Sequence, residues 1–242
     1  MKNVSYNNWN KWYELICHDF GFSMKDDIYS AKILNDLIHE IDKFNISDIH
    51  IKDKCIIFGA GPSIKKHIHF TKHNINLEEY TLIAADGTTT ALMEENIIPS
   101  IIVTDLDGNI NSIIEANKKG SILYVHAHGD NIDKIKRYVP KLKNIIPTTQ
   151  TKPFDLLENY GGFTDGDRAV HIAVYKLKIK KIILSGMDFG DIITNYSRPE
   201  IKVSTKKADK FKELKLNYAQ KLISSLKQEN KQITIYNLLD FC

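Results

Sequence analysis

Cysteine is scarce in this sequence. Cys17, Cys55 and Cys242 are the only three in 242 residues, and they lie far apart. They form no C-x-x-C pair, which excludes a disulfide framework and a cysteine-based zinc site. Isolated cysteines of this kind are typical of a reducing compartment, so we expect a cytoplasmic protein.

Long apolar runs and an excess of one charge are also missing. No stretch reaches the ~20 apolar residues of a membrane-spanning helix, and the polar start of the chain does not predict a signal peptide. Lysine and arginine total 33 against 30 aspartate and glutamate residues, a net charge of +3. This balance does not predict the strongly basic face of a nucleic-acid-binding protein. We therefore expect neither a membrane nor a nucleic acid as partner.

Two hydrophobic patterns divide the chain. Over residues 1–50 apolar residues recur every three or four positions, which predicts two helices separated near Gly21, the second beginning near Ser23. From residue 54 short apolar runs alternate with amphipathic segments. We predict an N-terminal helical segment over 1–50 and an α/β domain over 51–242. The apolar stripe of the first helix is formed by Trp9, Trp12, Tyr13, Ile16 and Phe20.

The apolar runs predict strands that are buried on both faces, because each run is nearly continuous in hydrophobicity. They cover 55–58, 82–85, 101–103, 122–125, 181–184 and 233–236, with a weaker candidate at 144–146. Alternation of such strands with helices predicts a doubly wound, mainly parallel, Rossmann-like sheet. The polar stretch 196–210 predicts a mobile loop before the last helix.

Polar residues follow five of these predicted strands. In a doubly wound sheet, ligands bind beyond the carboxyl ends of the strands. One such segment would be an ordinary turn, but five at the same edge predict a site. The segments are Gly59–Ser63, Asp86–Thr90, Thr104–Gly108, His126–Asn131 and Ser185–Gly190.

The first segment, Gly59-Ala60-Gly61-Pro62-Ser63, is suited to nucleotide phosphates. Glycines let backbone N–H groups approach an anion, and Pro62 fits the first turn of a following helix. The G-x-G-x-x-G fingerprint fails at Ile64, and the chain has no Walker A sequence. A plain strand-to-helix turn explains the segment equally well.

Asp105 and Asp107 give the stronger signal. Alternate residues at a strand end point the same way, so their carboxylates would repel each other unless a cation lies between them. Oxygen ligands of this kind suit Mg²⁺. The alternative is a solvated polar turn, but Asp86 at the end of the preceding strand favours the metal.

The segment Gly161–Ala169 adds Asp165 and Arg168 ahead of a predicted helix. Thr164 or Asp165 fits a helix cap, which is the structural alternative. In the functional interpretation Asp165 is a further acid, and the planar guanidinium of Arg168 neutralises phosphate charge. His126 and His128 lack the further ligands that zinc needs, so a polar strand end, or contact with phosphate or substrate, is favoured.

Together these segments resemble a known group of enzymes. Ala85-Asp86-Gly87, the strand ending in Asp105 and Asp107, and Thr164-Asp165 resemble the nucleotide and metal core of thiamine pyrophosphokinase-like enzymes. The set GAGPS, ADGTT, TDLDG, HAHGDN, GGFTDGDRA and SGMDFG resembles the archaeal 6-hydroxymethyl-7,8-dihydropterin pyrophosphokinase family. The resemblance covers about residues 50–190.

The resemblance implies a Mg²⁺-dependent reaction of tetrahydromethanopterin synthesis. ATP would donate its terminal diphosphate to the hydroxymethyl group of the reduced pterin and leave as AMP. Asp105, Asp107, Asp165 and Arg168 would be catalytic, with Asp130 or Asp165 available as general base. The implied metal ligands are Asp86, Asp105, Asp107 and Asp165; the residues binding ATP are Gly59, Gly61, Pro62, Ser63, Asp86, Gly87, Thr88 and Thr104; those binding the pterin are Asp188, Asp130, Asn131, His128 and Phe163.

Two other functions remain open at this stage. Glycosyltransferase-like proteins that modify flagellin share similar GAGPS and GMDF segments, and they would prefer a nucleotide-sugar to ATP. A non-catalytic nucleotide-binding module would bind ATP without forming a product. A homodimer is expected because related folds commonly pair.

Overall fold

The fold is a three-layer α/β/α sandwich around one parallel sheet. The computed structural model describes residues 6–41 and 51–241. All neighbouring strands of the sheet run parallel, in the order β5-β4-β3-β2-β1-β6-β9. The predicted doubly wound sheet is thus confirmed, including its weakest strand. The strands are β1 (Lys54–Phe58), β2 (Thr81–Ala85), β3 (Ile101–Thr104), β4 (Ile122–Ala127), β5 (Ile145–Thr149), β6 (Lys181–Ser185) and β9 (Thr234–Asn237).

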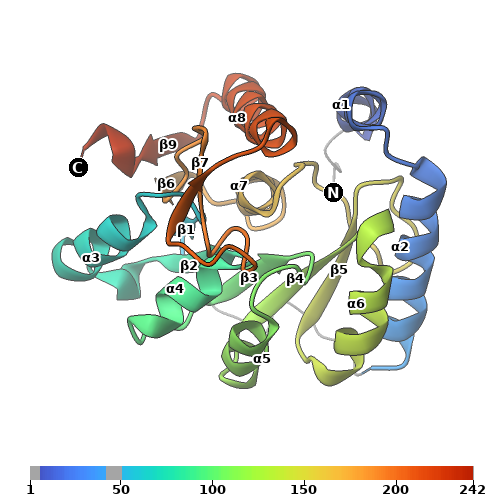
Figure 1. Ribbon diagram of the computed structural model, residues 1–242, viewed down its shortest axis with the longest axis horizontal. Coiled ribbons are helices and arrows are strands. Elements are labelled where there is room, and N and C mark those ends of the chain that lie inside the picture. The colour runs from blue at the N-terminus through green and yellow to red at the C-terminus, as the bar shows by residue number, and fades with distance from the viewer. Residues whose placement is uncertain (1–5, 42–50, 242) are drawn as a thin grey trace.

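Helices cover both faces of the sheet (Figure 1). α2 to α6 pack on one face, α7 and α8 pack on the other, and α1 lies against α8. The helices are α1 (Tyr6–Phe20), α2 (Met24–His39), α3 (Ile64–Asn74), α4 (Thr88–Glu94), α5 (Ile110–Lys118), α6 (Ile132–Tyr138), α7 (Asp165–Tyr175) and α8 (Lys210–Glu229), with short 3-10 turns at Leu77–Glu79, Gly129–Asn131, Val139–Lys141 and Leu238–Asp240. No helix within these described residues has the length and apolar character needed to cross a bilayer.

The sheet has two buried faces because its central strands are apolar at nearly every position. In β1, Ile56 and Phe58 join the core beneath α2 to α6, whereas Cys55 and Ile57 join the core beneath α7 and α8. All four side chains are fully buried. Alternation along the strand therefore distributes one continuous apolar run between two cores.

The N-terminal helices form part of the same fold. Gly21 takes φ +68°, which ends α1, and the Ser23 side chain caps α2, as predicted. The boundary expected at residue 50 lies at the end of residues 42–50, outside the described part of the chain. Both helices before it pack into the body of the protein, α2 on the sheet and α1 on α8.

A buried carboxylate ties these helices to the sheet. Asp27 of α2 is 3% exposed and accepts hydrogen bonds from the Tyr13 hydroxyl at 2.7 Å, the Gln150 amide at 2.7 Å and the Gly129 backbone N–H at 2.8 Å. Three donors satisfy the charge without a cation. One side chain thus links α1, the end of β5 and the loop after β4.

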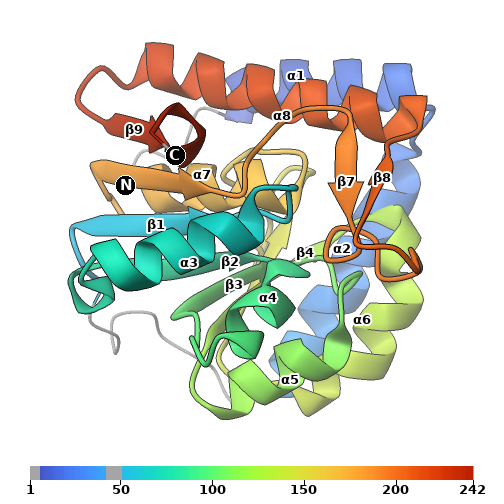
Figure 2. The ribbon, with the colours of Figure 1, turned by 60° about the vertical axis from the view of Figure 1, so that its left-hand side comes forward.

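The polar stretch 196–210, expected as a loop, contains a strand. β8 (Thr205–Lys207) pairs antiparallel with β7 (Ile192–Thr194), and Arg198 forms an ion pair with Asp209. Figure 2 shows this hairpin standing apart from the main sheet, ahead of α8. β8 is exposed along its whole length, so it lacks the apolar run by which strands are found in a sequence.

The order of the sheet reverses between β1 and β6, and the loops that follow these two strands pack tightly together. The N–H of Gly59 donates to Ser185 and that of Gly61 donates to Gly186, each at 2.8 Å. A Cβ on Gly61 would lie 2.0 Å from the Asp188 carboxylate and 2.6 Å from the Gly186 carbonyl oxygen. The glycines therefore allow two loops to touch at the switch point of the sheet.

We expect Gly61→Ala to destabilise the fold by about 1–3 kcal/mol, because overpacking forces the backbone of residues 186–188 to move. Urea unfolding of wild type and variant measures this. Gly190→Ala is the matched control, since a Cβ there meets no atom within 4 Å. Equal midpoints for Gly61→Ala and wild type would contradict the packing argument.

Candidate active site

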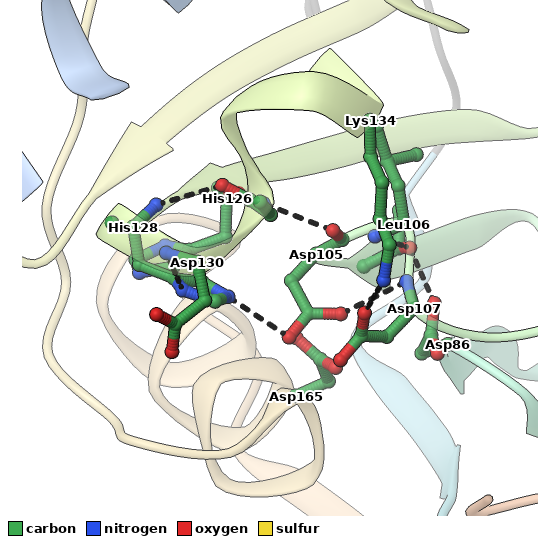
Figure 3. A network of polar contacts seen from close by, with 12 residues as sticks. Asp86, Asp105, Leu106, Asp107, His126, His128, Asp130, Lys134 and Asp165 are labelled. Carbon is green, nitrogen blue, oxygen red and sulfur yellow. Dashed lines mark hydrogen bonds and ion pairs between the residues drawn. The ribbon is translucent and has the colours of Figure 1, made fainter. Parts of the chain in front are cut away.

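Three carboxylates from distant parts of the chain meet at the carboxyl edge of the sheet. Asp86 follows β2, Asp105 follows β3, and Asp165 is the first residue of α7. One carboxylate oxygen of each lies within 4.8 Å of the others (Figure 3). We call these three residues the acidic cluster. All three were predicted as metal ligands, and the structure brings them together.

Left-handed turns aim two of these carboxylates. Asp86 has φ 39°, and Leu106, next to Asp105, has φ 66°. Such conformations are uncommon for residues other than glycine and need hydrogen bonds from their surroundings to hold them. Thr104 makes these hydrogen bonds, since its hydroxyl donates to the Asp86 carboxylate and accepts from the Leu106 N–H at 2.8 Å. Thr104 lines neither cavity of the site, so it acts as a positioning residue.

The three carboxyl groups of the acidic cluster have shifted pKa values, two raised and one lowered. Burial, and then the charge of Asp105, raise the pKa of Asp86 to about 7. Burial and the charges of Asp105 and Asp86 raise the pKa of Asp165 well above its ordinary value. Burial would also raise the pKa of Asp105, but the hydrogen bond from His128 and the positive charges of Arg168 and Lys215 lower that pKa. A bound cation would offset the repulsion among the three carboxylates.

His128 and Asn131 fix the position of Asp105. His128 Nδ1 accepts from the Asp130 N–H at 3.3 Å, which leaves Nε2–H to donate to Asp105 at 3.2 Å. The Asn131 amide donates to the Asp105 carbonyl at 2.9 Å and to the His126 carbonyl at 2.7 Å. Its oxygen accepts from the His128 N–H and from Ser30. Every polar group of the Asn131 side chain is thus hydrogen-bonded within the protein. Its predicted role in substrate binding stays a prediction.

Asp107 lies outside the acidic cluster. The expectation that Asp105 and Asp107 point the same way, as alternate residues of a strand do, is not met. β3 ends at Thr104, so the alternation of a strand does not extend to residues 105–107. The Asp107 carboxylate forms an ion pair with Lys134. Asp107 is also more exposed than Asp105, with 57% of its side chain accessible against 15%. It lines the same cavity, and its role as a ligand stays a prediction.

The start of α7 holds Asp165 and Arg168. Thr164 caps the helix, and Asp167 accepts from the Thr164 N–H at 2.7 Å, completing a capping box. Asp165 therefore stands in the first turn, free of capping. Arg168 is 5% exposed, donates to Asp165 and to Gln150 at 3.3 Å each, and leaves its buried Nε without a partner.

The Gly59–Ser63 turn does not offer a free phosphate cradle. Its glycine N–H groups bond to the loop after β6, as described above. The Asp188 carboxylate occupies the N-terminus of α3, where it accepts from the Ser63 N–H at 3.3 Å and from the Ser63 hydroxyl at 2.9 Å. The Asp188 carboxylate thus already occupies the position expected for a phosphate at this helix end. That the turn binds the phosphates or ribose of a nucleotide stays a prediction.

Two open cavities adjoin the cluster. The first, which we call the acidic cavity, has a volume of about 140 Å³ and is lined by Phe22, Asp26, Asp105, His128, Asp130, Phe163, Arg168 and Lys215, among others. The second, the glycine cavity, has a volume of about 130 Å³ and is lined by Gly59, Gly61, Gly186, Met187, Asp188 and Phe189, among others. They share Asp86, Thr164, Asp165, Ser197 and Lys212.

The predicted binding residues divide between the cavities. Of those expected to bind ATP, Gly59, Gly61, Asp86 and Gly87 line the glycine cavity, whereas Pro62, Ser63, Thr88 and Thr104 line neither. Of those expected to bind the pterin, Asp130, His128 and Phe163 line the acidic cavity, whereas Asp188 lines the glycine cavity.

Sequence reasoning missed several cavity residues. Phe22, Asp26 and Asp27 reach the acidic cavity from the N-terminal segment, and Lys212 and Lys215 reach it from α8. Burial lowers the pKa of both lysines. Their three-residue spacing places them on one helix face, but lysine is too frequent in this chain for that spacing to stand out.

Comparison with known proteins supplies a family. A family model described as 6-hydroxymethylpterin diphosphokinase MptE-like matches residues 27–194. The chain is 47% identical to a protein of Methanothermobacter thermautotrophicus, covering 91% of this chain and 94% of that protein. It is 49% identical to one of Methanocaldococcus jannaschii, covering 91% and 95% respectively, and 37% identical to one of Pyrococcus furiosus, covering 94% and 96%. Each is named 6-hydroxymethyl-7,8-dihydropterin pyrophosphokinase.

A solved structure supports the fold. The MAf glycosyltransferase of Magnetospirillum magneticum AMB-1 matches with a TM-score of 0.56 and 13% identity, over 90% of this chain and 36% of that one. At this identity the likeness concerns the arrangement of the chain and carries nothing about its chemistry.

We expect Asp165→Asn to stabilise the metal-free protein at pH 8 and to leave its stability nearly unchanged at pH 4. An acid whose pKa is raised on folding costs the folded state stability as pH rises above 3.8, its ordinary value, and the amide removes that cost. A gain of 1 kcal/mol corresponds to about 2–4 °C in Tm at this chain length.

Thermal unfolding with a chelator, and then with Mg²⁺, measures both effects. Added Mg²⁺ should stabilise wild type more than Asp165→Asn. Asp107→Asn, which lies outside the acidic cluster, serves as the control and should gain nothing. A lower Tm for metal-free Asp165→Asn at pH 8 would count against an unbalanced cluster.

Proposed function

The chain belongs to the 6-hydroxymethylpterin diphosphokinase MptE-like family, and we propose that its acidic cluster is where ATP donates its terminal diphosphate to the hydroxymethyl group of 6-hydroxymethyl-7,8-dihydropterin. AMP is the second product. The observation that carries this assignment is the position of the acidic cluster at the junction of two cavities. Two substrates can thus meet at one set of carboxylates. The reaction would serve tetrahydromethanopterin synthesis.

Asp86, Asp105 and Asp165 fit a Mg²⁺ ion. Carboxylate oxygens are the ligands that this ion prefers. Burial and the charge of Asp105 raise the pKa values of both Asp86 and Asp165, and a bound cation would offset both effects. When bound, Mg²⁺ supplies neutralisation of phosphate charge and fixes the orientation of phosphate oxygens. Asp107, which is paired with Lys134, would act on the ion through that lysine or through a bridging water molecule.

The two cavities suit the two substrates differently. The glycine cavity lies at the switch point between β1 and β6, where doubly wound sheets bind nucleotides, so we assign the nucleoside of ATP to it. The acidic cavity carries Phe22 and Phe163 for a flat ring and the Asp26 and Asp130 carboxylates for its N–H and amino edge. We assign the pterin there.

The residues of the protein then act chiefly by position and charge, as phosphoryl chemistry requires. His128 holds Asp105 by its Nε2–H, and Arg168 is aligned by Asp165 and Gln150 toward the junction. Asp130 lines the pterin cavity and is our candidate to accept the hydroxyl proton at its carboxylate. A cytoplasmic location and a homodimeric state are also part of the proposal, and both rest on the sequence.

We expect the protein, incubated with ATP, Mg²⁺ and the reduced pterin, to form AMP and the pterin diphosphate in equal amounts. Asp105→Asn should lower kcat/KM by about 100-fold or more, because it removes a charge that faces the transferred group. Asp107→Asn should lose much less. Separation of the nucleotide products by chromatography measures both.

The nucleotide product decides between reactions. ADP in place of AMP would refute diphosphate transfer, and turnover of Asp105→Asn near that of wild type would refute the metal assignment. Calorimetry with ATP and with a cytidine nucleotide-sugar adds a binding test, in which a preference for the sugar nucleotide would favour glycosyl transfer.

A further inference from the structure

Two lysines of α8 have no role in the site as described so far. We propose that Lys212 and Lys215 are the cations that bind the phosphates of ATP and of the diphosphate product. This inference rests on the proposed function. α8 begins at Lys210, beyond residues 27–194, which the family model matches.

The location of the two side chains is the first observation. Lys212 lines both cavities and so lies at their junction, beside the shared residues Asp86 and Asp165. Lys215, one turn later on the same helix face, lines the acidic cavity. A chain of phosphates that runs from the glycine cavity to the pterin would pass Lys212 at the junction and then enter the cavity that Lys215 lines.

The second observation is that both ammonium groups lack an anionic partner. Within residues 6–41 and 51–241, neither Nζ forms an ion pair or a hydrogen bond, although both are partly buried beside an acidic cluster. Other lysines of the chain do pair, as Lys134 does with Asp107. The carboxylates of Asp105 and Asp165 act on these ammonium groups through their charge alone. Each Nζ therefore keeps its N–H donors for an anionic ligand.

Three aromatic rings hold Lys215 in place. Its Nζ lies 5.3 Å from the ring centroid of Phe163, 5.6 Å from that of Phe211 and 6.0 Å from that of Phe22. The rings come from the segment before α7, from α8 and from the segment between α1 and α2. Cation–π contacts fix an ammonium group without neutralising it. The charge is therefore oriented in advance for an anion, which lowers the cost of binding one.

The charge of the substrate calls for these cations. A triphosphate carries more negative charge than one divalent ion neutralises, and Arg168 already shares its charge with Asp165. Lys212 and Lys215 supply the remainder.

The two lysines would act at different stages of the transfer. The hydroxymethyl oxygen forms a bond to the β-phosphorus, the bond from that phosphorus to the oxygen bridging to the α-phosphorus breaks, and its electron pair stays on AMP. The hydroxyl proton goes to a carboxylate of the acidic cavity. Lys212, at the junction, faces the atoms that exchange bonds, and Lys215 faces the diphosphate that ends on the pterin.

The test compares four variants of α8. Lys212→Met and Lys215→Met remove the charges and keep the length of the side chains, whereas Lys210→Met and Lys221→Met change exposed lysines that line neither cavity. We measure AMP formation with ATP and the reduced pterin, and binding of α,β-methylene-ATP with Mg²⁺ by calorimetry. Far-UV circular dichroism and Tm report folding.

We expect Lys212→Met to lower kcat by about 100-fold, as loss of a cation at the reacting atoms does, and Lys215→Met to act mainly by raising KM for ATP about 10-fold. Both should weaken binding of the analogue. Both controls should stay within about twofold of wild type. Should Lys215→Met fail to fold, Lys215→Arg replaces it and should recover most of the binding because the charge is kept.

The results also separate this inference from the function on which it rests. Wild-type turnover with unchanged kcat and KM in Lys212→Met and Lys215→Met would overturn the inference and leave the function standing. Equal losses in Lys210→Met would likewise overturn it. If wild type forms no AMP, the function fails, and weaker analogue binding by the Lys212 and Lys215 variants alone would still support a phosphate site.

Discussion

Mutual repulsion of three carboxylates is the interaction that the surrounding structure of this protein has to overcome. Asp86, Asp105 and Asp165 bring like charges within 4.8 Å of each other in a partly buried place. In the absence of a cation that arrangement opposes folding, so the surrounding structure has to hold it. Thr104 supports two left-handed turns, and His128 bonds to Asp105. A capping box formed by Thr164 and Asp167 leaves Asp165 free of capping at the start of α7, where Arg168 bonds to it.

The sheet explains why the constraint can be met. Parallel strands end at one edge, so residues some sixty positions apart in the sequence become neighbours there without any long-range pairing of their own. The reversal of strand order between β1 and β6 opens a second cavity beside the first. The glycines at this reversal let the two loops touch, and the same contact places Asp188 at the start of α3.

Most of the fold could be predicted from the sequence because its strands are buried on both faces. Continuous apolar runs such as Cys55–Phe58 identify each strand of the main sheet, and the polar segments after them locate the site. The sequence could not tell which acids converge. Asp107 follows the last residue of β3 by three positions, and the backbone between them turns. Glycines that serve loop packing also look the same in a sequence as glycines that cradle phosphate. Lys212 and Lys215 enter the site through tertiary packing of α8, for which no motif exists.

Asp27 has a consequence for how such a chain can change over evolutionary time. Its carboxylate receives hydrogen bonds from Tyr13, Gln150 and Gly129, and these residues belong to three elements, one of them the loop that carries His128. Helices α1 and α2 are thus hydrogen-bonded to residues that line the acidic cavity and do not form a separate domain. Recombination that replaced these helices with an unrelated segment would remove Asp27 and leave its buried hydrogen-bond donors without an acceptor. We therefore expect the helices and the residues that line the cavity to be inherited together.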